Sequence, residues 1–473
     1  MQALLLDGTG LTVPALAAIA TGTVPFTVDR FALERVAVAH TRFVEALVHT
    51  PVYGANTGVG ANRHEQASDL GLAILRSHCA GVGPEEDDAT ARATMVVRLN
   101  QILAGGSGVS RRTTEALAAA LRDDAVPTLH GWGAIGTSDL CALAELGLTL
   151  VGERPWRHAL GPVIELEPTD ALPLISSSAL TLATAALALT TAEMLLRASI
   201  VTAALSFLAL RGNLEAYDPI VHLSRAHLLQ PEVAAAVRSI VAGGGPAVRI
   251  QDPFGLRVLP QVTAPALAAT RNLAAVLAAE LNAAAENPLV TSDGVRHHGQ
   301  FHTATLATAL DTARGALLPA LALSSARLGL LMRPDMTGLR AFLADGPPGA
   351  SGLMITEYVV QDLLASMRAG IHPTASATLS ISLGVEEHAS FATQGARDLR
   401  AMTRLAPTLI AAELLAAIRA LRISPERLTP GLATHAFTVV SDALDPDLTD
   451  HPLDADLHNA AALLPALAAL LPL

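Results

Sequence analysis

The chain contains no lysine, so all 31 of its basic residues are arginine. This absence excludes pyridoxal and aldolase Schiff bases and the lysine of a phosphate-binding loop. Aromatic residues make up only 3% of the chain and the formal net charge is −12, which argues against nucleic acid as a partner. The two cysteines, Cys79 and Cys141, are too few for a disulfide framework or a Cys-x-x-Cys metal site, and they fit a cytoplasmic location.

Hydrophobic residues account for 51% of the 473 positions and charged residues for 16%, which is too apolar for a disordered chain. The N-terminus lacks a basic start and carries Asp7 early, so no signal peptide is expected. Residues 171–192 form the longest uncharged stretch and could span a bilayer by length alone. Because this stretch contains several Ser and Thr residues, we expect a helix buried in a large helical protein and no membrane.

Segments rich in Ala and Leu dominate, and almost none alternates with a period of two, which favours helices. The clearest helical runs are 114–121, 179–210, 263–285, 303–332 and 407–421, with a kink expected at Pro319. These patterns predict an all-α bundle of long helices. No repeat or linker marks a boundary, so we interpret 1–473 as one unit. Its N-terminal part runs to about 195, and a bundle with C-terminal helices occupies about 196–473.

Glycine-rich loops between the helices contain the residues that could perform chemistry. Tyr53 lies in PVYGANTGVG, where a lowered pKa would make its hydroxyl a general base, although a packed loop tyrosine explains it equally. His78 lies in LRSHCAGVG and is by itself most often structural. The run Thr137-Ser138-Asp139 in GAIGTSDLCALA is also typical of a helix N-cap.

Further candidates lie in the second half of the chain. Arg257, in QDPFGLRVLPQ, is flanked by apolar residues and could bind a carboxylate or form an internal ion pair. The histidines His297, His298 and His302 lack the carboxylate or cysteine spacing of a metal site, so we predict no metal. The remaining candidate segments are ELNAAAENP, GQFH and VEEH.

Taken together, the order and spacing of these segments resemble the histidine and aromatic amino-acid ammonia-lyase family over nearly the whole chain. YGANTG at 53–58 resembles the tyrosine-bearing lid loop of the family. QDPFGLR at 251–257 is similar to its QDPYSLR, ELNAAAENPLV at 280–290 to ExNxxxDNP, GQFH to GNFH, and EEH at 386–388 to Glu-Asp-His. SHCAGVG at 77–83 has the Ser-His form found in histidine ammonia-lyases.

This resemblance implies an all-helical homotetramer whose active sites are shared between subunits. Family enzymes remove ammonia from an amino acid, or move the amine, with a methylideneimidazolone electrophile made from an internal Ala-Ser-Gly. By position, Tyr53 corresponds to the base and Arg257 to the carboxylate-binding residue, and His78 and Glu386 correspond to contacts of the substrate side chain.

The electrophile loop departs from the family pattern GSVGASGDLAPLA by one missing residue. Either Thr137-Ser138-Asp139 or Gly136-Thr137-Ser138 therefore replaces the triad. The nitrogen of the third residue must attack the first carbonyl in a tight turn, and a Cβ on that third residue opposes the approach. We expect no methylideneimidazolone and no other cofactor.

Polar neighbours of the electrophile are altered as well. Ser176 stands where the family has the asparagine of Leu-Asn-Gly-Thr, Phe254 replaces the tyrosine of QDPYSLR, and Gln300 replaces the asparagine of GNFH. The acid–base and anchoring residues are retained.

Three hypotheses follow. The first is a repurposed enzyme that performs acid–base chemistry beside a carbonyl or carboxylate of a small substrate: elimination of a better leaving group, conjugate addition, cyclisation or isomerisation. The second is an orthodox histidine-type or aromatic ammonia-lyase or aminomutase. The third is a non-catalytic binding or partner subunit. Whether the substrate is free or bound to a carrier protein stays open.

Overall fold

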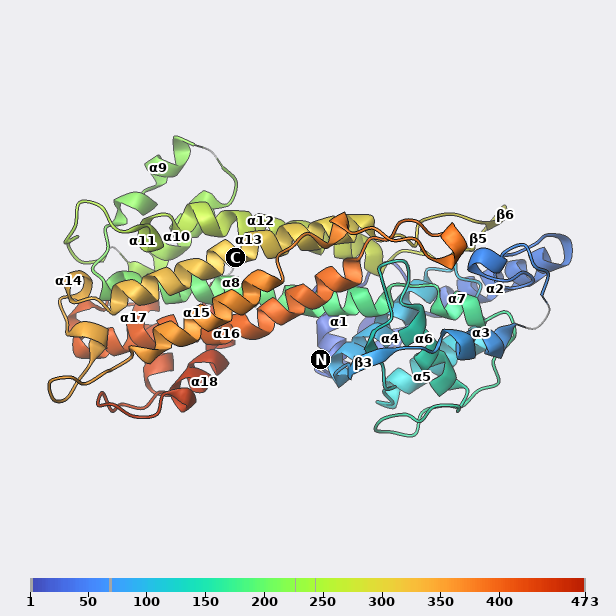
Figure 1. Ribbon diagram of the computed structural model, residues 1–473, viewed down its shortest axis with the longest axis horizontal. Coiled ribbons are helices and arrows are strands. Elements are labelled where there is room, and N and C mark those ends of the chain that lie inside the picture. Colours follow the sequence, from blue (N-terminus) through green and yellow to red (C-terminus); the bar gives the residue numbers. More distant parts are fainter. Residues whose placement is uncertain (1–2, 68–69, 226, 243, 472–473) are drawn as a thin grey trace. The chain divides into compact units, whose positions relative to one another are not determined.

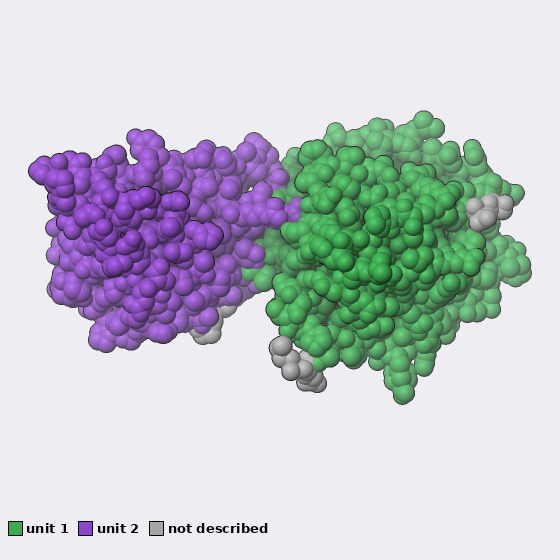
Figure 2. Space-filling model, turned by 90° about the horizontal axis from the view of Figure 1, so that it is seen from below, with its two compact units in different colours: residues 1–190, 273–311, 373–397 green, residues 191–272, 312–372, 398–473 purple. Residues whose placement is uncertain are grey.

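The computed structural model describes residues 3–67, 70–225, 227–242 and 244–471. Helices dominate, and the strands within these ranges form only three short two-stranded sheets (Figure 1). The predicted all-α fold is therefore confirmed. Two compact units are distinguished in Figure 2: unit 1 comprises 1–190, 273–311 and 373–397, and unit 2 comprises 191–272, 312–372 and 398–473. Residues 273–311 and 373–397, which we placed in the C-terminal part, thus belong to unit 1.

Unit 1 consists of short and medium helices with three small sheets. The strand pairs are β1 with β2 (parallel), β3 with β4 and β5 with β6 (both antiparallel). Its elements are β1 (Leu4–Leu6), α1 (Val13–Ala20), β2 (Phe26–Val28), α2 (Arg30–His49), α3 (Gly71–His78), β3 (Val82–Glu85), α4 (Asp88–Leu103), α5 (Arg111–Arg122), β4 (His130–Trp132), α6 (Leu140–Leu150), α7 (Ala171–Ile175), β5 (Leu289–Thr291) and β6 (Gly294–Arg296).

Four long helices contribute residues to both units: α8 (Ala179–Ala209), α12 (Leu259–Leu281), α13 (Ala304–Leu331) and α16 (Ala392–Ile423). These confirm the long helical runs of the sequence, and α13 continues through Pro319. Unit 2 adds α9 (Pro219–Leu223), α10 (Gln230–Val241), α11 (Phe254–Arg257), α14 (Pro334–Thr337), α15 (Ile355–Ala369), α17 (Leu432–Ser441), α18 (Asp454–Ala462) and α19 (Leu464–Ala468).

Side-chain caps define where the helices of unit 1 begin. Asp29 accepts a hydrogen bond from the Ala32 N–H at the start of α2, and Asp87 accepts one from Thr90 at the start of α4. Ser110 caps α5 in the same way. Each such cap satisfies an N–H that has no partner within the helix and contributes about 1 kcal/mol.

The apolar stretch 171–192 is buried, as predicted, but it is interrupted. Helix α7 ends at Ile175, Ser176–Ser178 are not helical, and α8 begins at Ala179. The most apolar window of Ala171–Ala209 is 94% buried inside the protein, which agrees with a core position. By length and composition alone, α12, α13 and α16 could also cross a membrane.

A buried ion pair fixes the interior of unit 1. The guanidinium of Arg98 on α4 donates to Glu286 at 2.8 Å and to the carbonyls of Pro173 and Leu174 at 2.7 and 2.9 Å. Both charged side chains are almost fully excluded from solvent. Arg98 therefore joins α4 to α7 and to the segment after α12. The last two elements contribute residues to the site described next.

Candidate active site

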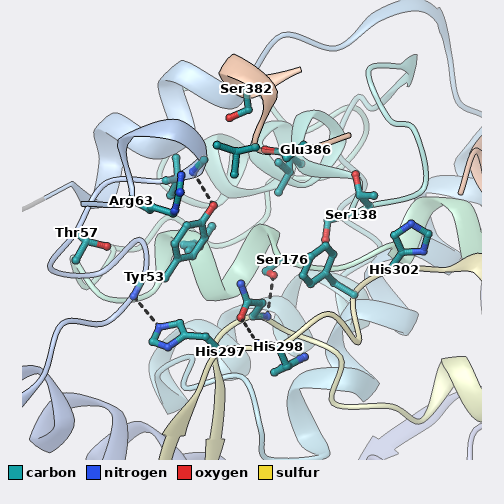
Figure 3. A pocket seen from close by; sticks show the side chains of 18 of the residues that line it. Tyr53, Thr57, Arg63, Ser138, Ser176, His297, His298, His302, Ser382 and Glu386 are labelled. Atoms are coloured by element: carbon teal, nitrogen blue, oxygen red, sulfur yellow. Dashed lines mark hydrogen bonds between the residues drawn. The ribbon is translucent and has the colours of Figure 1, made fainter. Parts of the chain in front are cut away.

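Unit 1 contains a cavity of about 800 Å³ (Figure 3). Its lining comes from 51–64, 137–140, 172–176, 287–302 and 382–388, together with His78. Of the predicted site residues, Tyr53, His78, Thr137, Ser138, Ser176 and Glu386 meet here. Six of the sixteen histidines of the chain also line it: His64, His78, His297, His298, His302 and His388.

Tyr53 is held at both ends. Its backbone N–H donates to Nε2 of His297 at 3.1 Å, and its hydroxyl oxygen accepts from the Gly60 N–H at 2.7 Å. Burial raises the pKa of the Tyr53 phenol above its ordinary 10.0 and Glu386 raises it further, while the Gly60 N–H and Arg63 oppose this. The phenol is consequently protonated at neutral pH, but two groups that stabilise its phenolate are already in place.

The segment 382–386 supports the tyrosine loop from the other side. The Ser382 hydroxyl oxygen accepts from the Ala61 N–H at 3.0 Å. Ser382, Leu383 and Gly384 all have positive φ values, of 52°, 56° and 83°. A left-handed conformation costs about 1–2 kcal/mol at a residue with a Cβ. Such strain is typical of functional loops, and here it precedes Glu386 in the cavity wall.

The loop 133–136 is anchored through three successive carbonyl groups. The Ala134 oxygen accepts from Gln394 Nε2 at 3.0 Å, and the Ile135 oxygen accepts from the Phe391 N–H at 2.8 Å. The hydroxyls of Thr303 and Ser390 both donate to the Gly136 oxygen, at 2.8 and 2.9 Å. Gly136 has φ +82°, and a Cβ there would lie 2.1 Å from Ser390 Oγ, so glycine is required.

The residues after this loop separate into two environments. Thr137 and Ser138 line the cavity, with Ser138 at φ +88°. Asp139 does not line the cavity and is fully buried. Its N–H donates to the Ser177 carbonyl at 2.7 Å, and its carboxylate accepts from the Thr181 N–H and hydroxyl at 2.7 and 2.8 Å. Burial raises the pKa of Asp139 to about 6, against these hydrogen bonds.

Two other predicted residues hold defined positions in the wall. His78 ends α3, and its Nδ1 lies 2.9 Å from the Ile74 carbonyl oxygen. Because a carbonyl only accepts, Nδ1 carries the proton, and Nε2 of the neutral ring is an acceptor. The Ser176 hydroxyl oxygen accepts from the Asn287 N–H at 3.2 Å.

The histidine-rich segment 297–302 contributes His297, His298 and His302 to the cavity wall. No group of three or more His, Cys, Asp or Glu that could hold a metal ion occurs among the residues that the structure describes. His298 Nδ1 accepts from the Gln300 N–H at 2.9 Å, so its Nε2 carries the proton. Gln300 itself is absent from the cavity lining.

Arg257 and Phe254 belong to α11 in unit 2, not to the lining of the cavity in unit 1. The guanidinium carbon of Arg257 lies 4.8 Å from the centre of the Phe254 ring. This is a cation–π contact. It shows that replacing the family's tyrosine by phenylalanine preserves the aromatic face.

Sequence reasoning missed Arg63, Ser382 and Asn287 as parts of the cavity wall. Arg63 lies beside the Tyr53 ring (Figure 3) and is close enough to influence its pKa. The signal for Arg63 was its position in the glycine-rich tyrosine loop, and Asn287 lies in the ENP motif. Nothing in the local sequence singles out Ser382.

Comparisons with known proteins agree on one family. A family model described as aromatic amino acid lyase matches residues 11–441. Histidine ammonia-lyase of Desulfotalea psychrophila is 32% identical and covers 88% of this chain and 86% of its own. Among solved structures, tyrosine aminomutase of Streptomyces globisporus is similar with a TM-score of 0.92 at 26% identity, covering 99% and 98% of the two chains. Histidine ammonia-lyase of Trypanosoma cruzi gives 0.89 at 26%, covering 98% and 94%.

Proposed function

Because the chain belongs to the aromatic amino acid lyase family, we propose that it is an enzyme of this family that works without a methylideneimidazolone group. It performs acid–base chemistry beside a carboxylate of a small substrate, by eliminating a leaving group better than ammonia, by conjugate addition or cyclisation, or by isomerisation. Its relatives named histidine ammonia-lyase support a carbon–nitrogen lyase ancestry. The cytoplasmic location stays a prediction.

One observation carries the proposal: the hydrogen bond from the Asp139 N–H to the Ser177 carbonyl. In a Thr137-Ser138-Asp139 triad this nitrogen would have to attack the Thr137 carbonyl. The carboxylate of Asp139 is also fixed by Thr181, so the residue cannot turn without breaking buried hydrogen bonds. These residues do not fit the prosthetic group.

The alternative triad, Gly136-Thr137-Ser138, is opposed by different contacts. The carbonyl oxygen of Gly136, which cyclisation would remove as water, accepts from the hydroxyls of Thr303 and Ser390. Those bonds would be lost. Ser138 would also bring a Cβ to the position that needs glycine.

Without an electrophile, the retained side chains define what chemistry is possible. Tyr53 moves a proton, and its phenolate is stabilised by the Gly60 N–H. The Nε2 lone pair of His78 offers an acceptor for a substrate N–H or O–H. Arg257 binds the carboxylate of the substrate from a neighbouring subunit, in a homotetramer with shared sites.

The test is the intact mass of the purified protein, measured to within a dalton, together with its ultraviolet spectrum. We expect the unmodified mass. A deficit of two waters, mapped to the peptide containing 137–139, would refute the proposal. Tyr53→Phe tests the acid–base part, since turnover that survives this change would exclude Tyr53 as the group that moves the proton.

A second candidate, an orthodox histidine ammonia-lyase, is favoured by the presence of His78 and Glu386 in the cavity and by the relatives of that name. Release of urocanate from histidine, together with the two-water deficit, would establish it.

A further inference from the structure

Two imidazoles in the cavity wall are bonded directly to one another. Nε2 of His302 lies 3.0 Å from Nδ1 of His388, and the ring centres are 5.0 Å apart. Such a contact requires an N–H on one ring and a lone pair on the other, so a single proton occupies the bond. His302 is partly buried and His388 is exposed. The pair therefore connects solvent with the cavity interior.

The histidine pair is tied to the loop that departs from the family pattern. Thr303, the residue after His302, donates to the Gly136 carbonyl through both its hydroxyl and its N–H. Ser390, two residues after His388, donates to the same oxygen. These bonds fix both histidines against the residue that immediately precedes Thr137. Ser138 and His302 lie on the same side of the cavity in Figure 3.

The surroundings of His302 favour its action as a proton donor. Burial lowers the pKa of His302, and His388 lowers it further, which makes a transient His302 imidazolium a stronger acid than an exposed one. Glu386 and Glu387 precede His388 and line the same cavity. The other titratable groups named above in this wall are Tyr53, Arg63, His64, His78, His297 and His298.

We propose that His302 and His388 form a proton relay that protonates a leaving group departing from the substrate at the Ser138 side of the cavity. This inference rests on the proposed function and specifies its substrate class. A group that needs a proton as it leaves is bonded through oxygen or sulfur, whereas ammonium departs as neutral ammonia without one. The substrate is accordingly a carboxylic acid with a hydroxyl, ether or thioether substituent next to the carbon that loses its proton.

The reaction balances without a further reagent. The base takes a proton from the carbon beside the carboxylate, and that electron pair forms the new C=C bond. The C–O or C–S bond breaks, its electrons go to the heteroatom, and the heteroatom takes a proton from the relay. Water reprotonates His388, and the base returns its proton to solvent. The products are an unsaturated acid and water, an alcohol or a thiol.

The test uses the full-length protein with two ethers, 3-phenoxypropanoate and 3-(4-nitrophenoxy)propanoate. Phenolate is a poor leaving group and needs the acid, but 4-nitrophenolate leaves largely unaided. We expect His302→Gln and His388→Gln to slow phenol release by about 10²-fold or more and 4-nitrophenol release by only a few fold. Added imidazole should restore phenol release in His388→Ala, because His388 is exposed.

The surface residue His458 on α18 supplies the matched control, and His458→Gln should release both phenols at the wild-type rate. Equal losses on the two ethers in His302→Gln would overturn the relay and leave the proposed function standing. Tyr53→Phe should slow both ethers alike, which separates the base from the acid. Release of neither phenol by the wild-type protein would overturn the proposed function for this substrate class and the relay with it.

Discussion

Replacing Asp139 by Asn should remove a pH dependence of stability that the wild-type protein carries. The carboxylate is fully buried, and its pKa is raised from the ordinary 3.8 to about 6. The folded protein thus binds a proton more tightly than the unfolded chain between these values. This contribution to stability is complete below pH 3.8 and is lost as the pH rises through 6. A shift of about two units corresponds to about 3 kcal/mol.

The asparagine can keep the surrounding hydrogen bonds. Its Oδ1 can accept from the Thr181 N–H, and its Nδ2 can donate to Thr181 Oγ1, which lies 2.7 Å from Thr393 Oγ1 and can donate there. Because the neutral amide has no charge to desolvate, the free energy of unfolding of Asp139→Asn, relative to wild type, should increase by about 2.4 kcal/mol from pH 4 to pH 7.

Urea unfolding at a fixed protein concentration, followed by circular dichroism at half-unit pH steps, measures this difference. Asp335→Asn is the control, since Asp335 is exposed, is paired with Arg333 and has a lowered pKa. Its relative stability should change in the opposite direction, because that ion pair stabilises the protein only while the carboxylate is charged. A relative stability of Asp139→Asn that stays constant or decreases toward pH 7 would refute the reasoning.

Three further predictions concern the site and the core. Since burial raises the pKa of the Tyr53 phenol, kcat/KM for a reaction that uses its phenolate should rise with pH and show no plateau below pH 10; a plateau near neutrality in the pH–rate profile would identify a different base. Gly136→Ala should lower the melting temperature through its φ of +82° and its clashes with Ser390 Oγ and the Ala392 backbone nitrogen. Adding Ser390→Gly should leave the melting temperature below the wild-type value, because the backbone clash remains and the Ser390 bond to the Gly136 oxygen is lost. Arg98→Met should cost about 3–5 kcal/mol by leaving Glu286 charged and buried, and the double variant with Glu286→Met should regain most of it in a denaturant-based double-mutant cycle.

The long helices were predictable because runs of Ala and Leu without charges have few alternatives to a buried helix. The ends of these helices were harder to predict. The run 407–421 is part of a helix that begins at Ala392, since α16 continues through Pro407. In the sequence, Pro407 looks like the first residue of a helix, because proline is common at that position. Inside α16 its missing N–H removes a backbone hydrogen bond, and only tertiary packing offsets that loss. The uncharged stretch 171–192 is likewise two helices, because Ser176–Ser178 interrupt it.

The candidate site was predictable where a motif placed a side chain in a glycine-rich loop, as with Tyr53 and His78. Sequence reasoning could not foresee that Asp139 is buried away from the cavity while its neighbour Ser138 faces it. That difference arises from the hydrogen bonds to Ser177 and Thr181, which belong to a distant part of the chain. Pairing of His302 with His388 has the same origin, because 86 positions separate the two residues.

The tyrosine loop is bonded to the opposite side of the cavity wall through Ala61 and Ser382, which are 321 positions apart in the chain. A ribosome that adds about 5–20 residues per second therefore needs roughly 16–64 s after completing the tyrosine loop before Ser382 exists. Until then unit 1 is incomplete, because residues 373–397 belong to it. The discontinuous arrangement therefore means that unit 1 can complete its contacts only after most of the chain has been synthesised.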